Sequence, residues 1–392
     1  MMSDLEKSDL HELLLQSASK EKFYFESKDG LTTVLALGPT ETVPFSKAPQ
    51  FLQNNPELLL WSAMSFENVS ASSFYASYLT LFKKNGKVKL IINPHLIGDQ
   101  ESCFNFQKDE PLNPIKSIEH TPDYANWALM LNEALELLNQ DTLTKIVLKR
   151  KKIIEFQNTI HPLHVFEKVY SPNSECYKIF VQDNPSQGFI SLTPETLFSL
   201  TNNRTINTMS VAGSVPRGTS KAEETQFEEE LKHSTKLIHE QNVVTDEINK
   251  RLQSIAEDVQ TSELDIMKLQ YIQHRANYIK AELNNDKSFL DIITTLHPTP
   301  AVGGSPNNLA LNAIASLEKD TRNNYAAPIG FATLEYSEWA VGLRSAIINN
   351  KTVTVFAGCG VVTGSIPEAE WLETENKMRP FADLYTEVPG HV

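Results

Sequence analysis

The stretch GCGVVTGSIPEAEWLETENKMRPF, residues 358–381, joins a glycine-rich segment to a helix rich in acidic residues. Within eight positions it carries Glu368, Glu370, Glu373 and Glu375. Two interpretations stand side by side. The glycines turn the chain and a solvated acidic helix follows, or the backbone and the carboxylates together hold an anion and a metal ion. Spacing alone favours the first, although Trp371 between two of the glutamates indicates that one face of the helix is not solvated.

Two common motifs are excluded around these residues. Gly364 falls one residue too late for GxGxxG, and only 28 residues follow it, too few to complete a dinucleotide-binding unit. HEQNV at 239–243 lacks the second histidine of the zinc-protease motif HExxH. Glu240 is still unusual, because it lies beside the apolar stripe of a predicted helix.

Composition narrows the class of protein. The 392 residues carry a formal net charge of −14, which argues against nucleic-acid binding, since that requires a basic surface. No apolar run reaches the length of a membrane span, and the charged N-terminal stretch lacks the features of a signal peptide. Three cysteines without a CxxC spacing suit a reducing compartment. We therefore expect a cytoplasmic protein.

Strand-like stretches, rich in β-branched and aromatic residues, surround a set of predicted helices. We expect strands within 23–37, 58–68, 73–94, 145–156, 176–183, 188–192 and 196–200, and a hairpin over 338–360. Residues 97–120 are expected to form a long connection, with Thr121 capping the helix that follows. Further helices are predicted at 221–257, 265–283, 309–322 and in the acidic stretch. This pattern favours one large α+β domain over separable modules.

Two charged residues are predicted to lie in apolar strand surroundings. Lys145 precedes Ile146, Val147 and Leu148, and Glu195 lies between strand residues in SLTPETLFSL. Burial lowers the pKa of a lysine and raises that of a glutamate. The two together would supply a base and an acid at neutral pH. The alternatives are a lysine that reaches solvent at the strand mouth and an ordinary exposed glutamate.

Two further residues are candidates for a site. His297 lies in TTLHPTPAVGGSP, a rigid loop with prolines and paired glycines, and such loops often carry function. Its alternative role is that of a loop histidine with satisfied hydrogen bonds. Arg344 is a lone cation in the apolar strand EWAVGLRSAII and needs an anionic partner from the protein or from a ligand.

In chain order, these stretches resemble the chorismate-binding enzymes. The resemblance rests on KIVLKR, TPETL, AGSVPRG, HEQNVVTDEI, LHPTPAVGGSP, RNNYAAPIGF, EWAVGLRSAII and FAGCGVVTGSIPEAEWLETENK, and it covers residues 121–383. It implies one chorismate-binding α+β domain over 1–392, with layered antiparallel sheets flanked by helices and with 1–120 as a variable N-terminal part. The HPTPAVGG loop is similar to that of the isochorismate synthases, where ammonia-using relatives have a loop like FPAGTLSGAPK.

The resemblance also implies a role for each matching residue. Lys145 would activate water, Glu195 would protonate the departing hydroxyl, and His297 would lie near the reacting ring. Mg²⁺ would bind Glu240 and Glu373, with Glu370 nearby. The substrate would contact Gly213, Ser214, Tyr325, Arg344, Gly358, Gly360 and Lys377.

The implied activity is Mg²⁺-dependent, reversible conversion of chorismate to isochorismate. Salicylate synthase, which adds pyruvate elimination at the same site, is the alternative. The resemblance implies a monomer without a glutaminase subunit, and no nucleic-acid or membrane partner. It leaves open whether the product serves menaquinone, siderophore or salicylate synthesis.

Overall fold

Antiparallel strand pairs dominate the structure, a computed structural model that describes residues 9–98, 113–140, 142–172 and 175–384. The strands are β1 (Lys22–Glu26), β2 (Thr32–Pro44), β3 (Leu60–Ala63), β4 (Ser73–Lys84), β5 (Lys87–Ile92), β6 (Ile115–Thr121), β7 (Lys145–Phe156), β8 (Tyr177–Asn184), β9 (Gln187–Thr193), β10 (Thr196–Thr201), β11 (Thr205–Pro216), β12 (Ala256–Thr261), β13 (Asp265–Lys268), β14 (Ile272–Leu283), β15 (Gly304–Ser305), β16 (Pro328–Ala332), β17 (Tyr336–Val341), β18 (Ser345–Asn349) and β19 (Thr352–Val361). The helices are α2 (Leu10–Leu15), α3 (Ala48–Asn54), α4 (Tyr124–Asn139), α5 (Pro162–Val169), α6 (Lys221–His233), α7 (Thr235–Leu252), α8 (Phe289–Leu296), α9 (Asn307–Glu318) and α10 (Pro367–Met378).

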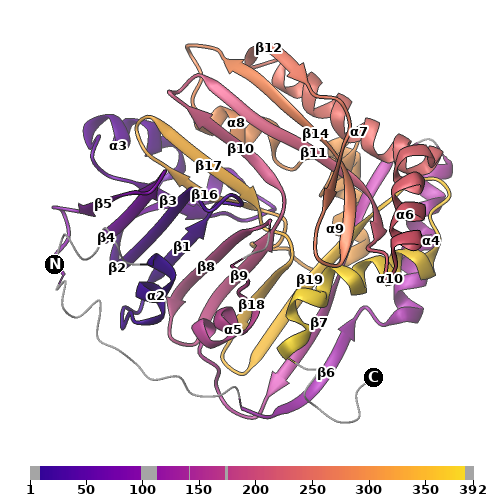
Figure 1. The fold of residues 1–392 in the computed structure, drawn as a ribbon, viewed down its shortest axis with the longest axis horizontal. Coiled ribbons are helices and arrows are strands. Elements are labelled where there is room, and N and C mark those ends of the chain that lie inside the picture. Colours follow the sequence, from indigo (N-terminus) through magenta and orange to yellow (C-terminus); the bar gives the residue numbers. More distant parts are fainter. Residues whose placement is uncertain (1–8, 99–112, 141, 173–174, 385–392) are drawn as a thin grey trace.

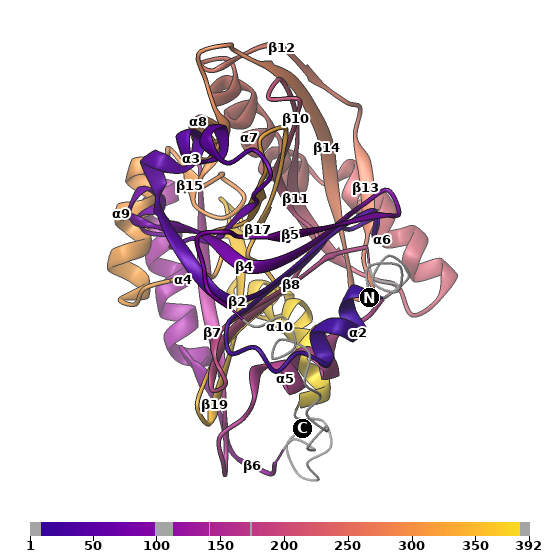
Figure 2. The same ribbon diagram turned by 90° about the vertical axis from the view of Figure 1, so that its left-hand side faces the viewer.

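All the described strands join one hydrogen-bonded sheet, so the expected α+β class is confirmed and the expected layers are parts of a single sheet. Neighbouring strands run in the order β6–β7–β19–β18–β9–β8–β1–β2–β4–β3–β16–β17–β10–β11–β14. Figure 1 shows β10, β11 and β14 across the upper part and β8, β9 and β18 below them, while α4, α6, α7 and α10 gather on the right. Turning the molecule brings β2 and β4 to the front, between α4 and α6 (Figure 2).

Helices α7 and α10 each bury a narrow stripe of side chains. On α7, Leu237, Gln241, Val244 and Ile248 face the sheet because they recur every three or four residues, and Glu240 falls within the same buried stripe. On α10, Glu370, Thr374 and Met378 are buried at the same spacing. These stripes turn one glutamate of each helix toward the protein interior.

The prediction of a helix over 265–283 is wrong. Residues 265–268 and 272–283 form β13 and β14, and β14 pairs along its whole length with β11. Apolar residues in this stretch recur every three or four positions (Ile266, Leu269, Ile272, Ala276, Ile279, Leu283), which imitates a helix. Pairing with β11 on one side and with β12 and β13 on the other overrides that local pattern.

Three smaller expectations also need correction. The helix predicted at 221–257 is two helices, because the Ser234 side chain caps α7 by accepting from the backbone of Leu237. Helix α4 is capped by Asp123 rather than by Thr121, through a bond from the Asn126 amide of 2.9 Å. Within the stretch predicted to be a connection, residues 115–121 form β6 on the edge of β7, and residues 99–112 lie outside the described part.

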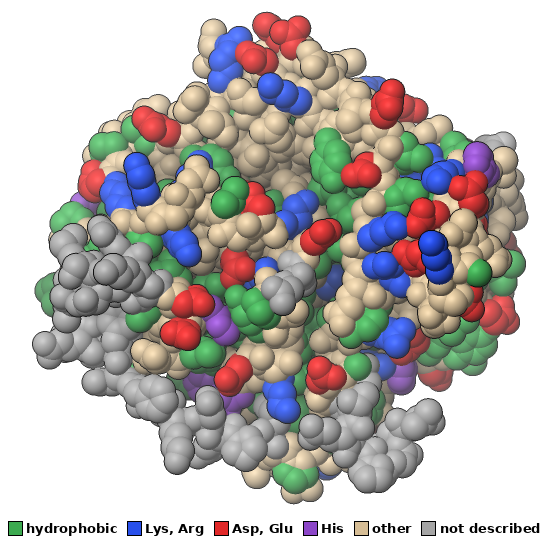
Figure 3. Space-filling view, in the orientation of Figure 1, with side chains coloured by type: hydrophobic (Ala, Val, Ile, Leu, Met, Phe, Trp, Pro, Cys, Tyr) green, Lys and Arg blue, Asp and Glu red, His purple; other side chains and the backbone are tan. Residues whose placement is uncertain are grey.

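On the face drawn in Figure 3, acidic and basic side chains are interspersed over most of the described surface. None of the described helices combines the length and the apolar character that a membrane span requires.

A buried ion pair between Arg322 and Glu318 lies against β7. The Arg322 guanidinium bonds both carboxylate oxygens of Glu318, at 2.6 and 3.0 Å, and also donates to the carbonyls of Val302 and Val147 at 2.6 and 2.8 Å. Both charged side chains are 1% exposed.

We expect Arg322→Met to destabilise the protein by about 3–5 kcal/mol, because it removes the two-point partner of the buried Glu318 carboxylate and leaves it only the longer ion pair with Lys149 Nζ, at 3.7 Å. Glu318→Leu combined with Arg322→Met should recover part of that loss. Denaturant unfolding of the two variants and the wild type measures this. A double variant less stable than Arg322→Met would contradict the prediction.

Candidate active site

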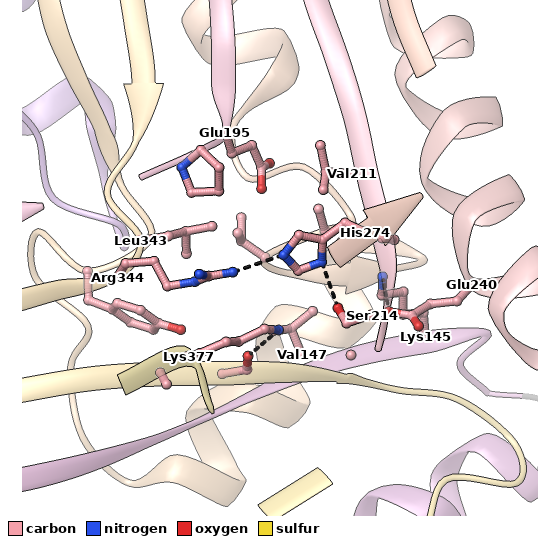
Figure 4. A pocket seen from close by; sticks show the side chains of 18 residues that line it. Lys145, Val147, Glu195, Val211, Ser214, Glu240, His274, Leu343, Arg344 and Lys377 are labelled. Carbon is pink, nitrogen blue, oxygen red and sulfur yellow. Dashed lines mark hydrogen bonds and ion pairs between the residues drawn. The ribbon is translucent and has the colours of Figure 1, made fainter. Parts of the chain in front are cut away.

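A cavity at the junction of β7, β11, β14, β19, α7 and α10 contains most of the predicted site residues (Figure 4). Its lining consists of Lys145, Val147, Pro194, Glu195, Val211, Ala212, Ser214, Glu240, His274, Ala301, Val302, Tyr325, Leu343, Arg344, Ala357, Gly358, Gly360 and Lys377. The cavity measures ≈ 60 Å³, because its charged side chains turn toward one another. A ring-sized ligand therefore requires some of them to move.

Lys145 begins β7 and is 1% exposed. Its Nζ lies 3.0 Å from Glu240 Oε1, so a strand end and a helix meet through an ion pair inside the protein. Gly360 on β19 passes directly over this pair. A Cβ at that position would lie 2.3 Å from Glu240 Oε1 and 2.8 Å from Lys145 Cε. Glycine at 360 is thus required by the close approach of the backbone.

Glu195 enters the cavity from the segment between β9 and β10, on a different side from Lys145 (Figure 4). Its side chain is buried, and burial raises its pKa to about 7, against the opposing charges of Lys145 and Lys377. At neutral pH this carboxyl group therefore exists in both protonation states in comparable amounts. This is the direction in which burial of a strand glutamate was expected to act.

His274 on β14 lines the cavity and was not predicted. Its Nδ1 lies 2.8 Å from Ser214 Oγ and its Nε2 lies 2.9 Å from Arg344 Nη2. Guanidinium nitrogens only donate, so Nε2 accepts and Nδ1 carries the proton that is donated to Ser214. The Ser214 hydroxyl hydrogen is then available to a ligand. Burial, together with Arg344 and Lys377, holds the pKa of His274 well below its ordinary value, which keeps the ring neutral.

The signal for His274 was hidden by the wrong helix prediction. With 265–283 as a strand, the register places His274 opposite Ser214 on β11. A bulge falls between Ala212 and Ser214, where Gly213 has φ +71°. Gly213 itself does not line the cavity, and its part is to turn the strand so that Ser214 does.

The remaining cations and the tyrosine complete the lining. Arg344, 7% exposed, reaches the cavity from a backbone with φ +46° just before β18. Tyr325 stacks on Phe356 with ring centroids 5.3 Å apart. Lys377 Nζ bonds the carbonyl of Gly358 at 2.9 Å and Glu373 Oε1 at 2.6 Å.

The acidic helix α10 divides its carboxylates between different partners. Glu370 is 2% exposed and pairs with Lys236 of α7 at 2.8 Å, and Glu373 pairs with Lys377. Glu375 instead bonds Arg150 and Lys152. Burial and the neighbouring charge of Glu373 raise the pKa of Glu370, and Glu240 adds to the same effect. Neither Glu370 nor Glu373 lines the cavity, and no three acidic, histidine or cysteine side chains in the described ranges are arranged as a metal site.

His297 lies outside the cavity lining. Its Nε2 is 2.9 Å from the carbonyl of Phe66, and the Phe66 ring packs edge-on against it. Burial lowers the pKa of this histidine to about 4. The loop that it begins does reach the cavity, through Ala301 and Val302. The contacts of His297 favour a role in holding this loop against the segment that contains Phe66.

A model of the chorismate binding enzyme family matches residues 69–385. The chain is 33% identical over 282 residues to the chloroplastic isochorismate synthase of Catharanthus roseus, which covers 71% of this chain and 48% of that protein. It therefore spans about half of the plant relative. It is also 27% identical over 372 residues to isochorismate synthase MenF of Escherichia coli, covering 91% of this chain and 86% of the bacterial protein.

Solved structures agree with the fold described above. The structure of Escherichia coli MenF, the menaquinone-specific isochorismate synthase, superposes with a TM-score of 0.85 over 96% of this chain and 91% of that one, at 25% identity. Anthranilate synthase component I from Streptococcus pneumoniae shares the fold at a TM-score of 0.69 and 18% identity, covering 93% and 91% of the two chains. The resemblance seen in the sequence motifs is confirmed: the chain belongs to the family of chorismate binding enzymes.

Proposed function

We propose that this chain is an isochorismate synthase, which interconverts chorismate and isochorismate. The observation that carries the proposal is that a buried lysine and a buried glutamate with a pKa of about 7 line one cavity beside Arg344 and Lys377. The names of the relatives support the same activity. We propose a cytoplasmic monomer that acts without a glutaminase subunit.

The cations of the cavity suit a substrate with two carboxylates. Arg344 can turn its guanidinium from His274 to a carboxylate, because the present contact is to a neutral ring. Lys377 is anchored to the Gly358 carbonyl and can donate to the same ligand. Ser214 has a free hydroxyl hydrogen, and Tyr325 provides a further donor at the cavity wall. The glycines at 358 and 360 allow the backbone to approach closely.

The chemistry needs one base and one acid. Lys145 would accept a proton from the water that attacks C2 of the chorismate ring. Glu195 would give its proton to the hydroxyl that leaves C4, so that one water enters, one leaves and the double bonds shift without oxidation or reduction. A carboxyl group with a pKa near 7 can act in both directions at neutral pH, which suits a reversible reaction.

Carboxylate oxygens are the ligands that Mg²⁺ prefers, and Glu240 on α7 with Glu370 and Glu373 on α10 would hold the ion after rearrangement, since their present positions do not form a metal site. Burial and the charges of Glu373 and Glu240 raise the pKa of Glu370. Lysines pair with each of them in the present arrangement. The ion would neutralise the repulsion between these carboxylates and a substrate carboxylate.

A second candidate function is salicylate synthesis, in which pyruvate is eliminated from isochorismate at the same site. It is weighed because the same cavity would hold the isochorismate from which pyruvate is lost, and His274 Nε2 would be left without a donor once Arg344 turned to a substrate carboxylate. We keep His297 as a residue that positions the 297–302 loop rather than one that contacts the ring.

We expect Lys145→Ala to lower kcat by about 10²–10⁴, because the attacking water loses its base. Chromatographic measurement of chorismate consumption checks this. Lys151→Ala, six residues further along the same strand and paired with Asp320 outside the cavity lining, is the matched control and should retain activity. Full turnover by a folded Lys145→Ala protein would refute the assignment.

We expect kcat/KM for chorismate to fall as pH rises through about 7. Glu195 must be protonated to act as an acid, and its raised pKa means that the protonated fraction declines above that value. Glu195→Gln should lose most of the activity. The same variant should gain stability relative to wild type as pH rises from about 4.5 to about 7 and keep that gain above it, because the folded-state pKa lies above the unfolded one. A flat pH profile in the wild type between 6 and 8 would contradict the role.

We expect purified protein to convert chorismate to a mixture with isochorismate that reaches a plateau in the presence of Mg²⁺, and to stop when EDTA is added. NMR identification of the products checks both points. Salicylate and pyruvate would instead establish the second candidate function. Anthranilate or aminodeoxychorismate formed only with ammonia would overturn both.

A further inference from the structure

A second cavity, of ≈ 360 Å³, shares no lining residue with the candidate active site. It lies where β3 and β4 face β8, β9 and β18, strands that Figure 1 shows on the left and in the lower centre. Its lining consists of Trp61, Ala63, Tyr75, Val181, Asp183, Gln187, Gly188, Phe189, Asn324, Ile347, Ile348 and Asn349. Its volume falls within the range of small-molecule pockets in proteins.

The inner wall of this cavity is aromatic and held firmly in place. Trp61 packs against Tyr75 with ring centroids 4.8 Å apart and stacks on Phe23 at 4.7 Å. The indole Nε1 donates to Ser77 Oγ at 3.0 Å, which fixes the ring from behind. Phe189 and Val181 continue the wall, each almost fully buried. A flat apolar group is therefore the body that this wall would accept.

Asp183 is the only charged side chain in the described lining, beside the polar side chains of Tyr75, Gln187, Asn324 and Asn349. The Asp183 carboxylate makes no hydrogen bond or ion pair with any described residue, and it stands at the exposed rim. Asn324 uses its amide nitrogen to donate to the carbonyls of Ala63 and Met64, at 3.1 and 3.0 Å, so only its oxygen remains for a ligand. None of the described lining residues is a lysine, arginine or histidine. The active-site cavity has the opposite character, with Lys145, Arg344 and Lys377 in its lining.

We propose that this cavity is a second ligand site, which binds a small amine carrying a flat apolar body. The ammonium group would pair with Asp183 and lie over the aromatic wall, where the ring faces attract a cation. The flat body would fill the space against Trp61 and Phe189. An anion such as chorismate is excluded, because it would meet a carboxylate and no compensating cation.

Two adjacent residues join the second cavity to the candidate active site. The inference that the two sites influence one another rests on the proposed function. Asn324 lines the second cavity and its neighbour Tyr325 lines the first. The flanking Asn323 and Ala326 have φ of +52° and +62°, a conformation that leaves this segment little freedom to absorb a shift locally. A ligand that binds Asn324 should therefore change the affinity for chorismate.

The test is calorimetric titration of the full chain with phenethylamine, compared with 2-phenylethanol and 3-phenylpropanoate, which replace the ammonium by a neutral group and by an anion. We expect binding of the amine alone, weakened about tenfold or more by Asp183→Asn. Asp286→Asn, another exposed aspartate-to-asparagine change, should leave it unaltered. Glu195→Gln should also leave it unaltered, since an amine bound in the active site would lose affinity there.

Equal binding of the anion, an unchanged affinity in Asp183→Asn, or a loss in Glu195→Gln would each overturn the proposal. The coupling between the two cavities is measured separately. We expect the KM for chorismate to change twofold or more when the amine is saturating. An unchanged KM refutes the connection while the calorimetry upholds the ligand site. If the protein does not turn over chorismate at all, the proposed function fails, and the titration still decides the second site.

Discussion

The buried contact between Lys145 and Glu240 constrains how β7, α7 and β19 pack together. An ion pair taken out of water is stable only if its neighbours exclude solvent and leave room for its geometry. Here a glycine of β19 passes so close to the pair that any side chain at position 360 would collide with it. Glycine at position 360 therefore lets β19 pass close to the Lys145–Glu240 pair, and β19 in turn shields that pair from solvent.

The charges around the cavity are arranged in mutual compensation. Each inward carboxylate of α7 and α10 has a lysine partner, and Arg344 rests on a neutral histidine. Such a set can be rearranged at modest electrostatic cost when an anion and a cation enter together, because each protein charge exchanges one partner for another. The small free volume of the cavity follows from the same pairing.

Local sequence patterns predicted the strands 145–156 and 176–200 and the last hairpin, because their alternation and turn residues agree with the fold. They failed at 265–283, where the spacing of apolar residues imitates a helix and long-range pairing decides the outcome. That failure concealed His274, whose importance depends on the residue opposite it in another strand. Motif resemblance singled out Lys145 and Glu195, which the fold brings into one cavity, but it carries no information on the contact between His297 and the carbonyl of Phe66, because that contact joins distant segments.

The sheet joins distant parts of the chain, and this has a consequence for how the protein is made. Strand β1 pairs with β8, and β7 pairs with β19, so paired residues are separated by about 150 to 160 positions in the first case and about 200 to 215 in the second. A ribosome that has released β7 must still synthesise most of the remaining chain before β19 can cover it. One edge of β1 thus stays unpaired until β8 is made, and one edge of β7 stays unpaired until β19 is made, so folding is governed by slow, non-local contacts. The cavity of the candidate active site, which is lined by residues from 145 to 377, is among the last features to assemble.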